Sequence, residues 1–247
     1  MNLTKFQNKV LRQEYKYYIS YQTSLALKSQ LRNYMDIDQN ANETSGTYKV
    51  RSLYFDTQDQ NDFTEKVDGL YLREKFRVRS YEESSDLFKF ESKKRTDLAI
   101  KKTSEIVDIQ TVKSIISGNY DLLLSKRSSF LGSAYAKLKG DGYMPRVIVE
   151  YDRLAYCLPY NNIRITLDLN LRSYNSCVNL IEPNVASSPV FKDNAQILEI
   201  KFTGFLPSHL KSIISKFVST RNSISKFVLC QQQISHDPWA DVIDKPF

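Results

Sequence analysis

Lysines and arginines at every second position are the residues of this sequence with the clearest chemical potential. The segment Leu70–Tyr81 contains four of them in one row: Arg73, Lys75, Arg77 and Arg79. In an extended strand these side chains point to one face and stand about 6.7 Å apart. Neighbouring charges at that spacing repel by about 2.5 kcal/mol at an effective dielectric constant of ~20, and by about 0.6 kcal/mol in water. A solvated row is therefore tolerable, whereas an enclosed row requires a bound anion or interleaved carboxylates.

The same alternation recurs in other segments, where cations and a few carboxylates alternate with apolar residues. Its polar positions are Arg12, Glu14 and Lys16; Glu91, Lys93 and Arg95; Lys101, Thr103 and Glu105; Arg164, Thr166 and Asp168; and Glu199 and Lys201, with Tyr151 and Arg153 ending a further strand. Arginine and lysine bind phosphate oxygens and carboxylates hold divalent cations, so these faces suit phosphate chemistry. The sequence has no Gly-x-x-x-x-Gly-Lys loop and no Gly-x-Gly-x-x-Gly motif, so the usual nucleotide-binding folds are not supported.

Antiparallel strands must position these residues, because alternation with a period of two is typical of such strands. Helical signals are few: one over Thr23–Met35, one that begins after Asp108 and ends at Gly118, and one that begins after Ser208. We therefore predict an α+β fold dominated by strands. A two-sheet sandwich would expose the charged faces, whereas a closed barrel would gather them in its lumen under external helices; the pattern alone does not distinguish them.

The composition limits the remaining alternatives. Lys+Arg 35 and Asp+Glu 28 give the 247-residue chain a formal charge of +7, which points to an anionic partner without identifying it. Cys157, Cys177 and Cys230 are widely spaced and the two histidines are isolated, so no disulfide framework, zinc site or histidine-based catalysis is indicated. We expect a single domain spanning residues 1–247. Because the chain shows no signal-peptide pattern and no long apolar segment, we expect this domain in the cytoplasm.

The charged segments also belong to a series of short motifs. In chain order these are Arg12-x-Glu14-x-Lys16-Tyr17, Arg51-Ser52-Leu53-Tyr54-Phe55-Asp56, Lys66-x-Asp68-Gly69, Arg73-x-Lys75-x-Arg77-x-Arg79, Glu91-x-Lys93, Arg146-Val147-Ile148-Val149-x-Tyr151-x-Arg153, Arg164-Ile165-Thr166-x-Asp168, Glu199-Ile200-Lys201 and Ser225-Lys226-Phe227. The series resembles the VTC domain, the polyphosphate polymerase domain of the triphosphate tunnel metalloenzyme (CYTH-like) superfamily, from about residue 9 to residue 230. The resemblance implies an eight-stranded antiparallel β-barrel that forms a basic tunnel with helices packed outside, and so favours the barrel over the sandwich.

The resemblance also implies roles for individual residues. The cations expected to grip the reacting phosphates are Lys16, Arg77, Arg79, Lys93, Arg153, Arg164 and Lys201. Further substrate-binding residues are Arg12, Arg73, Lys75, Lys101, Tyr151, Ser225 and Lys226, with Lys101 preferred over the adjacent Lys102 and with Arg73 and Lys75 toward a tunnel mouth. Glu199 matches the metal-binding glutamate of the family. Glu14 and Asp168 are either further metal ligands or ion-pair partners of neighbouring cations, and Glu91 is expected to pair with Lys93.

Three functions are compatible with these residues. The first is a polyphosphate polymerase that transfers the γ-phosphate of ATP to a growing polyphosphate chain with Mn²⁺ or Mg²⁺. The second is a metal-dependent triphosphatase, and the third is a non-catalytic polyphosphate-binding module. Hydrolase and cyclase branches of the superfamily typically begin with Glu-x-Glu-x-Lys, and Arg12 replaces the first glutamate here, which favours the polymerase. Nucleic acid is not an expected partner, since most aromatic residues alternate to the apolar faces. A separate membrane partner is compatible with the sequence, but no segment indicates one.

Overall fold

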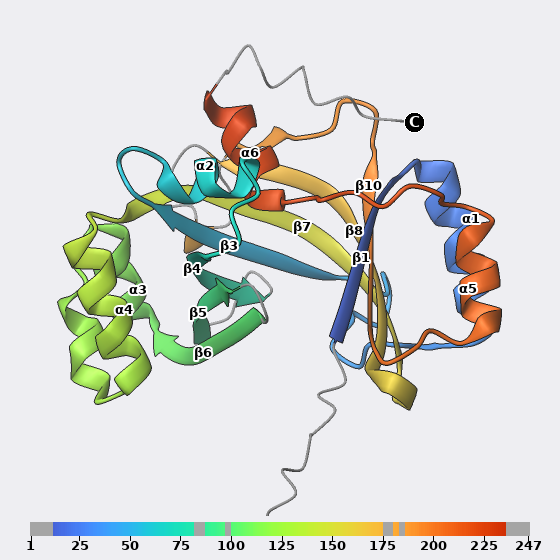
Figure 1. Cartoon of the computed structure of the whole chain (residues 1–247), viewed down its shortest axis with the longest axis horizontal. Helices are drawn as coiled ribbons and strands as arrows, with labels where there is room; N and C mark the ends of the chain where they lie inside the picture. The colour runs from blue at the N-terminus through green and yellow to red at the C-terminus, as the bar shows by residue number, and fades with distance from the viewer. Residues whose placement is uncertain (1–11, 82–86, 97–99, 175–179, 183–185, 236–247) are drawn as a thin grey trace, which may run out of the picture.

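A computed structural model describes residues 12–81, 87–96, 100–174, 180–182 and 186–235 (Figure 1). The strands are β1 (Arg12–Ile19), β2 (Asp36–Ile37), β3 (Tyr48–Asp56), β4 (Arg73–Tyr81), β5 (Leu87–Arg95), β6 (Ile100–Asp108), β7 (Met144–Leu158), β8 (Ile163–Tyr174), β9 (Ser188–Pro189) and β10 (Gln196–Thr203). The α-helices are α1 (Tyr21–Leu31), α2 (Asn61–Val67), α3 (Ile109–Ile116), α4 (Ser129–Gly140), α5 (Ser208–Ser215) and α6 (Lys226–Ser235), and the 3₁₀ helices are η1 (Asp121–Lys126) and η2 (Tyr160–Asn162).

The strands form one curled antiparallel sheet. Its main path runs β1-β10-β8-β7-β3-β4-β5-β6, with β2 paired to β7 and β9 paired to β8. Within the described residues, the edge strands β1 and β6 do not pair with each other, so the sheet is a half-barrel with helices around it (Figure 1). The predicted α+β fold, with an antiparallel sheet curled around a basic face and helices outside, is confirmed.

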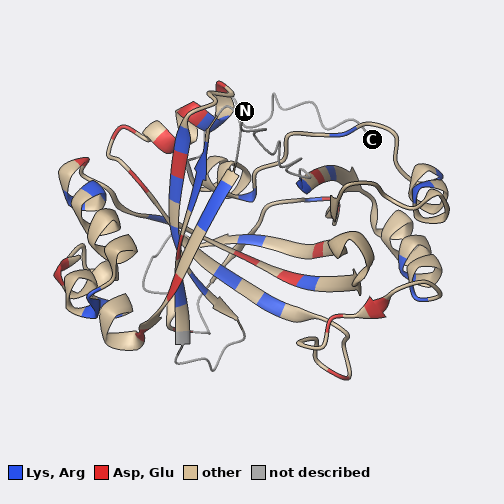
Figure 2. Ribbon diagram, turned by 60° about the horizontal axis from the view of Figure 1, so that its bottom comes forward, with Lys and Arg blue, Asp and Glu red and all other residues tan. Residues whose placement is uncertain are grey.

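The registers place most of the predicted strand cations, but not Lys101, on the concave face of the half-barrel. Lys16 lies opposite Glu199 in the β1–β10 pair, and Lys75 lies opposite Lys93 in the β4–β5 pair. Because side chains alternate along a strand, the same registers send the intervening apolar residues to the convex face. Lys and Arg residues accordingly recur along the strands as well as on the helices (Figure 2).

Two apolar clusters on the convex face hold the helices against the sheet. Residues of β3, β4 and β5, including Leu53, Phe76 and Phe90, pack with residues of α3, α4 and η1. Residues of β1, β8 and β10, including Leu198, pack with α1 and α5 through residues such as Leu27. Each large apolar side chain buried in this way contributes about 1.5–3 kcal/mol of stability, which offsets the cost of gathering like charges on the opposite face.

A third apolar cluster lies on the concave side and anchors α6. Phe227 and Cys230 of α6 pack with Val50 of β3, Val149 of β7 and Ile197 of β10. The concave face is therefore apolar where α6 covers it and charged beyond the helix. This arrangement brings Lys226, the first residue of α6, to the boundary between the two regions.

The helix predictions were correct in part. The helix predicted over Thr23–Met35 is present as α1, but it begins at Tyr21 and ends at Leu31. Asp108 caps α3 by accepting a hydrogen bond from the Thr111 N–H. Ser208 was wrong as a cap, because it is the first residue of α5 and Pro207 precedes the helix without a side-chain cap. The helices α2, α4 and α6 were not predicted. The buried residues Phe227, Val228, Leu229 and Cys230 are consecutive, so α6 lacks the apolar periodicity of an amphipathic helix.

The prediction for β6 has the alternation right but the faces reversed. Lys101 lies opposite Lys94, whereas Lys102 lies opposite Lys93 and therefore on the concave face. Ile100 and Ile106 share that face and remain exposed. The period of two shows which residues share a face, but it does not show which of the two faces is buried. In an edge strand such as β6, which has few core contacts, the apolar residues do not identify the buried face.

None of the described helices is long and apolar enough to span a membrane.

The Asp108 cap provides a test of the local helix energetics. Replacing an N-cap aspartate with alanine costs about 1 kcal/mol, whereas asparagine caps almost as well. We expect Asp108→Ala to lower the free energy of unfolding by about that amount, and Asp108→Asn to lower it by less than half as much. Urea denaturation followed by circular dichroism measures both, with Ser208→Ala as a control that should stay close to the wild type. Equal losses in Asp108→Ala and Asp108→Asn would assign the effect to charge and contradict the cap.

Candidate active site

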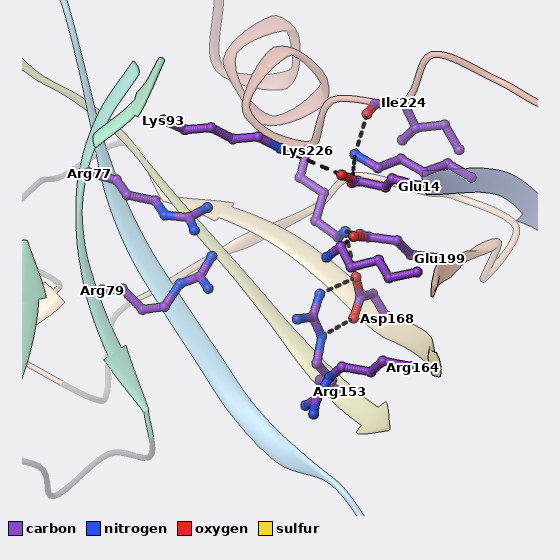
Figure 3. Close-up of polar contacts among 12 residues, drawn as sticks. Glu14, Arg77, Arg79, Lys93, Arg153, Arg164, Asp168, Glu199, Ile224 and Lys226 are labelled. Atoms are coloured by element: carbon purple, nitrogen blue, oxygen red, sulfur yellow. Dashed lines mark hydrogen bonds and ion pairs between the residues drawn. The ribbon is translucent and has the colours of Figure 1, made fainter. Parts of the chain in front are cut away.

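Charged side chains from two walls of the half-barrel face each other across the concave side (Figure 3). One wall carries Arg77 and Arg79 from β4 and Lys93 from β5. The other wall is built from β1, β10, β8 and β7, and α6 adds its first residue. This wall carries Glu14, Arg153, Arg164, Asp168, Glu199 and Lys226. It also carries Lys16, which lies opposite Glu199, and Lys201, which ion-pairs with Glu199.

Glu199 is the carboxylate at the centre of the second wall. It is buried, ion-pairs with Lys201, and has Lys226 Nζ 4.0 Å from its second oxygen. Burial opposes ionisation, but Lys201, Lys16 and Lys226 outweigh it and hold the pKa of Glu199 well below its usual range. Glu199 is therefore a fixed negative charge within a cluster of cations.

Asp168 is bound on both oxygens by cations. Arg153 donates to it through Nε at 2.6 Å and Nη2 at 2.8 Å, and Lys226 Nζ lies 2.5 Å from Oδ2. A β-bulge in the β7–β8 pair lies just before the point where Arg153 comes opposite Asp168. Burial disfavours both charged forms, yet the pair lowers the pKa of Asp168 and raises that of Arg153 well above its usual range. Of the two roles left open by the sequence, the geometry favours that of an ion-pair partner for Asp168.

Glu14 connects the two walls. Its carboxylate lies 3.0 Å from Lys16 Nζ on its own strand and 3.7 Å from Lys93 Nζ on β5. Lys16 also donates to the backbone carbonyl of Ile224 at 3.2 Å, which ties β1 to the segment before α6. Glu14 thus also has the geometry of an ion-pair partner. Its contact with Lys93 links the edge strand β1 to β5, the neighbour of the other edge strand, β6.

Glu91 organises the first wall. Arg77 Nε donates to it at 2.6 Å, Arg79 Nε lies at 3.9 Å, and Lys102 forms a further ion pair. Burial would raise the pKa of Glu91, but Arg77, Arg79 and Lys102 lower it to about 2. The expected pairing of Glu91 with Lys93 was wrong, because Lys93 interacts with Glu14 instead.

Hydroxyl groups of β3 complete the fixation of the two arginines. Arg77 Nη1 donates to Tyr54 Oη at 2.8 Å, and Arg79 Nε donates to Ser52 Oγ at 3.1 Å. With one guanidinium edge held in this way, each arginine keeps N–H groups for a phosphate, so its geometry is set before the substrate arrives.

Arg164 lies at one end of the concave face in a compensated environment. It ion-pairs with Asp38, donates through Nη2 to Tyr48 Oη at 2.9 Å, and has Cys157 Sγ 3.2 Å from Nη1. Asp38 was not predicted as a partner of Arg164. It lies just after β2 and meets Arg164 of β8 only in the folded chain, so no local sequence pattern marks it.

The remaining predicted substrate-binding residues have different surroundings. Tyr151 is buried, with the Arg153 guanidinium 5.0 Å and Lys226 Nζ 4.9 Å from its ring centroid. The Ser225 hydroxyl accepts a long hydrogen bond of 3.5 Å from the Val228 N–H at the start of α6. Arg12 is exposed at the beginning of β1.

Lys75 was predicted to lie toward a tunnel mouth, but its amine is buried under α6. Its Nζ lies 4.1 Å from the centroid of the Phe227 ring and has no hydrogen-bond partner among the described residues. Burial lowers the pKa of Lys75 to about 7, although the carboxylates of Asp62 and Asp56 act in the opposite direction. Lys75 is thus less available for phosphate than Arg77 on the same strand.

The concave face also contains cations that the sequence analysis did not assign. Lys102 contacts Glu91, Lys89 lies opposite Arg79, and Arg95 lies opposite Arg73. Lys66 of α2 donates to the Ser223 hydroxyl at 2.8 Å. Lys89 and Arg95 were detectable as members of the alternating β5 segment, and Lys66 belongs to the Lys66-x-Asp68-Gly69 motif, to which no role was assigned.

The acidic groups fit a divalent cation only together with a substrate. The described residues contain no group of three or more His, Cys, Asp or Glu side chains placed to bind one metal ion. Glu199 remains a suitable carboxylate ligand, since Mg²⁺ and Mn²⁺ are commonly held by one or two carboxylates and by substrate phosphates. Its present partners, Lys201 and Lys226, are also able to bind those phosphates.

The comparisons with known proteins agree with the fold. The VTC domain family model matches residues 11–234, so the chain belongs to the VTC domain family. No curated protein matches the sequence. Among solved structures, a candidate adenylyl cyclase from Hippeastrum, described as having a dominant triphosphatase activity, is 14% identical with a TM-score of 0.57, over 90% of this chain and 96% of that chain. A candidate adenylate cyclase from Bacillus halodurans is 19% identical with a TM-score of 0.49, over 87% of this chain and 95% of that chain.

The Glu91 cluster predicts a pH-dependent contribution to stability. Because the pKa of Glu91 is lowered from 4.5 to about 2, its stabilisation is complete above pH ~4.5 and is lost as the pH falls toward ~2. The full effect is about 3 kcal/mol. We expect Glu91→Gln to be less stable than the wild type at pH 6, with the difference shrinking at pH 3. Thermal unfolding at both pH values measures this, and a difference that stays constant with pH would contradict the ion-pair assignment.

The register of β6 predicts that adjacent lysines contribute unequally to phosphate binding. Lys102 shares the concave face with Lys93, whereas Lys101 points to the other face. A charge-assisted contact to phosphate is worth about 1.5 kcal/mol, or roughly tenfold in affinity. We expect Lys102→Ala to weaken tripolyphosphate binding by about that factor and Lys101→Ala to change it less than twofold, as measured by calorimetry at fixed salt. The reverse order would show that the strand is paired in the other register.

Proposed function

We propose that this protein is a polyphosphate polymerase that transfers the γ-phosphate of ATP to the end of a polyphosphate chain. The observation that carries the proposal is the opposed pair of cationic walls around Glu199. The two walls contribute cations that were expected to grip the reacting phosphates, among them Arg77, Lys93, Arg153 and Lys201, and α6 adds the substrate-binding candidate Lys226. A linear polyanion placed between the walls would meet positive charge on both sides.

The acids on the concave face neutralise only part of this charge. Glu91 is shared by Arg77, Arg79 and Lys102, and Glu199 is shared by Lys201 and Lys226. Several cations per carboxylate leave a surplus that favours a multiply charged anion. The fixed guanidinium groups suit phosphate oxygens, which accept two N–H groups of an arginine at once.

In the proposed reaction, a terminal phosphate oxygen of the chain attacks the γ-phosphorus of ATP. The new P–O bond extends the chain, the bond to the β-phosphate bridging oxygen breaks, and ADP leaves with that electron pair. Arg77 and Arg79, held by Glu91, Tyr54 and Ser52, orient the phosphates from the β4 side. Lys16, Lys201 and Lys226 neutralise the developing charge from the Glu199 side.

A divalent cation, Mn²⁺ or Mg²⁺, would be held by Glu199 and substrate phosphates and would supply charge stabilisation on the leaving phosphate. Asp168 would act through Arg153 and Lys226, because these cations occupy both of its oxygens. Its role is then to fix the orientation of the two cations.

The alternative function is a triphosphatase, in which water attacks the same phosphorus. The Hippeastrum protein of similar fold is described as having such an activity, although an identity of 14% supports only the fold. Arg12 favours the polymerase, because it provides a cation where the hydrolase branches have a glutamate. The protein incubated with ATP and Mn²⁺ or Mg²⁺ should form long-chain polyphosphate, resolved by gel electrophoresis. Orthophosphate without polymer would support the triphosphatase instead.

Glu199→Ala distinguishes either enzyme from a non-catalytic binding module. Removing this buried carboxylate, whose ion-pair partners are the lysines Lys201 and Lys226, should abolish ATP turnover while leaving polyphosphate affinity intact or higher, since a negative charge is lost. Turnover is measured by ADP release and affinity by calorimetry, with the exposed Glu43→Ala as the matched control. Undiminished turnover in Glu199→Ala would remove this residue from the mechanism, and absence of turnover in the wild type would favour the binding module.

A further inference from the structure

An apolar rim surrounds one end of the cationic face. Large apolar side chains are exposed at the last residue of α2, in the segment that links it to β4 and at the start of β6: Val67, Leu70, Tyr71, Leu72 and Ile100. Tyr71 is 64% exposed and Leu72 is 67% exposed. Leu72 precedes β4, which begins only at Arg73. Exposed apolar groups gathered in this way commonly mark a binding site.

The rim is continuous with two arginines at the end of β4 and β5. Arg73 lies opposite Arg95 in the β4–β5 pair, and Arg95 lies opposite Ile100 in the β5–β6 pair. The Arg95 guanidinium is 5.9 Å from the centroid of the Tyr71 ring, and Arg73 donates to the carbonyl of Leu70. Tyr71, Arg73, Arg95 and Ile100 therefore form one mouth of the concave face.

The cations at this mouth have no carboxylate partners among the described residues. No ion pair within 4.0 Å involves Arg73 or Arg95 there, whereas Arg164 at another edge of the face is paired with Asp38. Arg95 acts electrostatically on Arg73, and the Glu65 carboxylate acts on it less strongly and in the opposite direction. Burial lowers the pKa of Lys66, and Arg73, Lys16 and Arg95 lower it further, so Lys66 lies within electrostatic range of each of these three cations. Positive charge thus extends from the mouth to Lys16, which is opposite Glu199.

An inorganic phosphate chain would use the cations of this mouth but not its apolar rim. A nucleoside triphosphate would use both, because its base is a flat, largely apolar ring joined to a polyanion. An exposed tyrosine beside an arginine is a common platform for a base, through stacking and cation–π contacts. The distribution of charge and apolar surface therefore matches a nucleotide that enters phosphates first.

We propose that Tyr71 is the nucleobase platform of the phosphate donor, with Arg73 and Arg95 receiving its phosphates. This inference rests on the proposed function, since it concerns how that site takes a nucleotide. The Arg95 guanidinium lies over the Tyr71 ring, and most of the tyrosine remains exposed, so a base can stack on it. Tyr71 thereby sets the preference for ATP over an inorganic triphosphate.

Equilibrium binding of two ligands to the full chain tests the proposal. ATP and tripolyphosphate are titrated by calorimetry, without metal, into the wild type, Tyr71→Ala, Tyr71→Phe and Tyr160→Ala. Loss of a base-stacking ring weakens binding by roughly tenfold. We expect Tyr71→Ala to lose about that factor for ATP, to stay within about twofold for tripolyphosphate, and Tyr71→Phe to retain ATP binding. Tyr160 is a matched control, because it is exposed and its ring packs on Phe205 with centroids 6.0 Å apart.

The two ligands separate failure of the inference from failure of the proposed function. Equal losses for ATP and tripolyphosphate in Tyr71→Ala, or no loss for either, would overturn the base platform while leaving the phosphate site in place. A wild type that binds neither ligand would overturn the proposed function itself. A loss of ATP binding in Tyr160→Ala as large as in Tyr71→Ala would also contradict the assignment, since it would show a general effect on the fold.

Discussion

The structure depends on confining an excess of positive charge to one concave face. Cations at every second strand position would repel at the spacing of a β-strand, and burial would strengthen that repulsion. The carboxylates of Glu14, Glu91, Asp168 and Glu199 lie among them and reduce it, and each one binds at least two cations. Because they are outnumbered, the compensation is incomplete. The same imbalance that limits stability therefore leaves positive charge that an anion can neutralise.

The architecture makes this imbalance tolerable by separating the two faces of the sheet. Strand alternation sends apolar side chains outward, where α1 and α5 cover one half and α3 and α4 cover the other. The curl of the half-barrel brings its two charged walls to face each other, so cations far apart in sequence lie on the same concave face. Lys93 and Glu14 show this directly, because their contact joins β5 to β1 across the concave side.

How much of the site the sequence could predict follows from the nature of each contact. Residues placed by alternation, such as Lys16, Arg77 and Glu199, lie where the pattern indicated. The pattern could not decide which face of β6 is buried, because Ile100 and Ile106 are apolar yet exposed, so Lys101 was chosen where Lys102 lies on the charged face. Partners that come from other elements were also beyond the pattern. Asp38 contacts Arg164 from a segment distant in sequence. Glu91 ion-pairs with Arg77 of the neighbouring strand rather than with Lys93 of its own strand, because the side chain of Arg77 lies closer to it in the folded protein.

The last described helix links the folding of the chain to the assembly of the site. Lys226 is the first residue of α6, where the helix dipole disfavours a cation. Asp168 and Glu199 offset that cost, and Phe227, the next residue, is buried in the apolar cluster that holds α6 against the sheet. The position of Lys226 is therefore set jointly by an ion pair on one side and by apolar packing on the other. Since Lys226 also fixes Asp168, and Asp168 fixes Arg153, the cationic wall around Glu199 takes its full geometry only when α6 is docked.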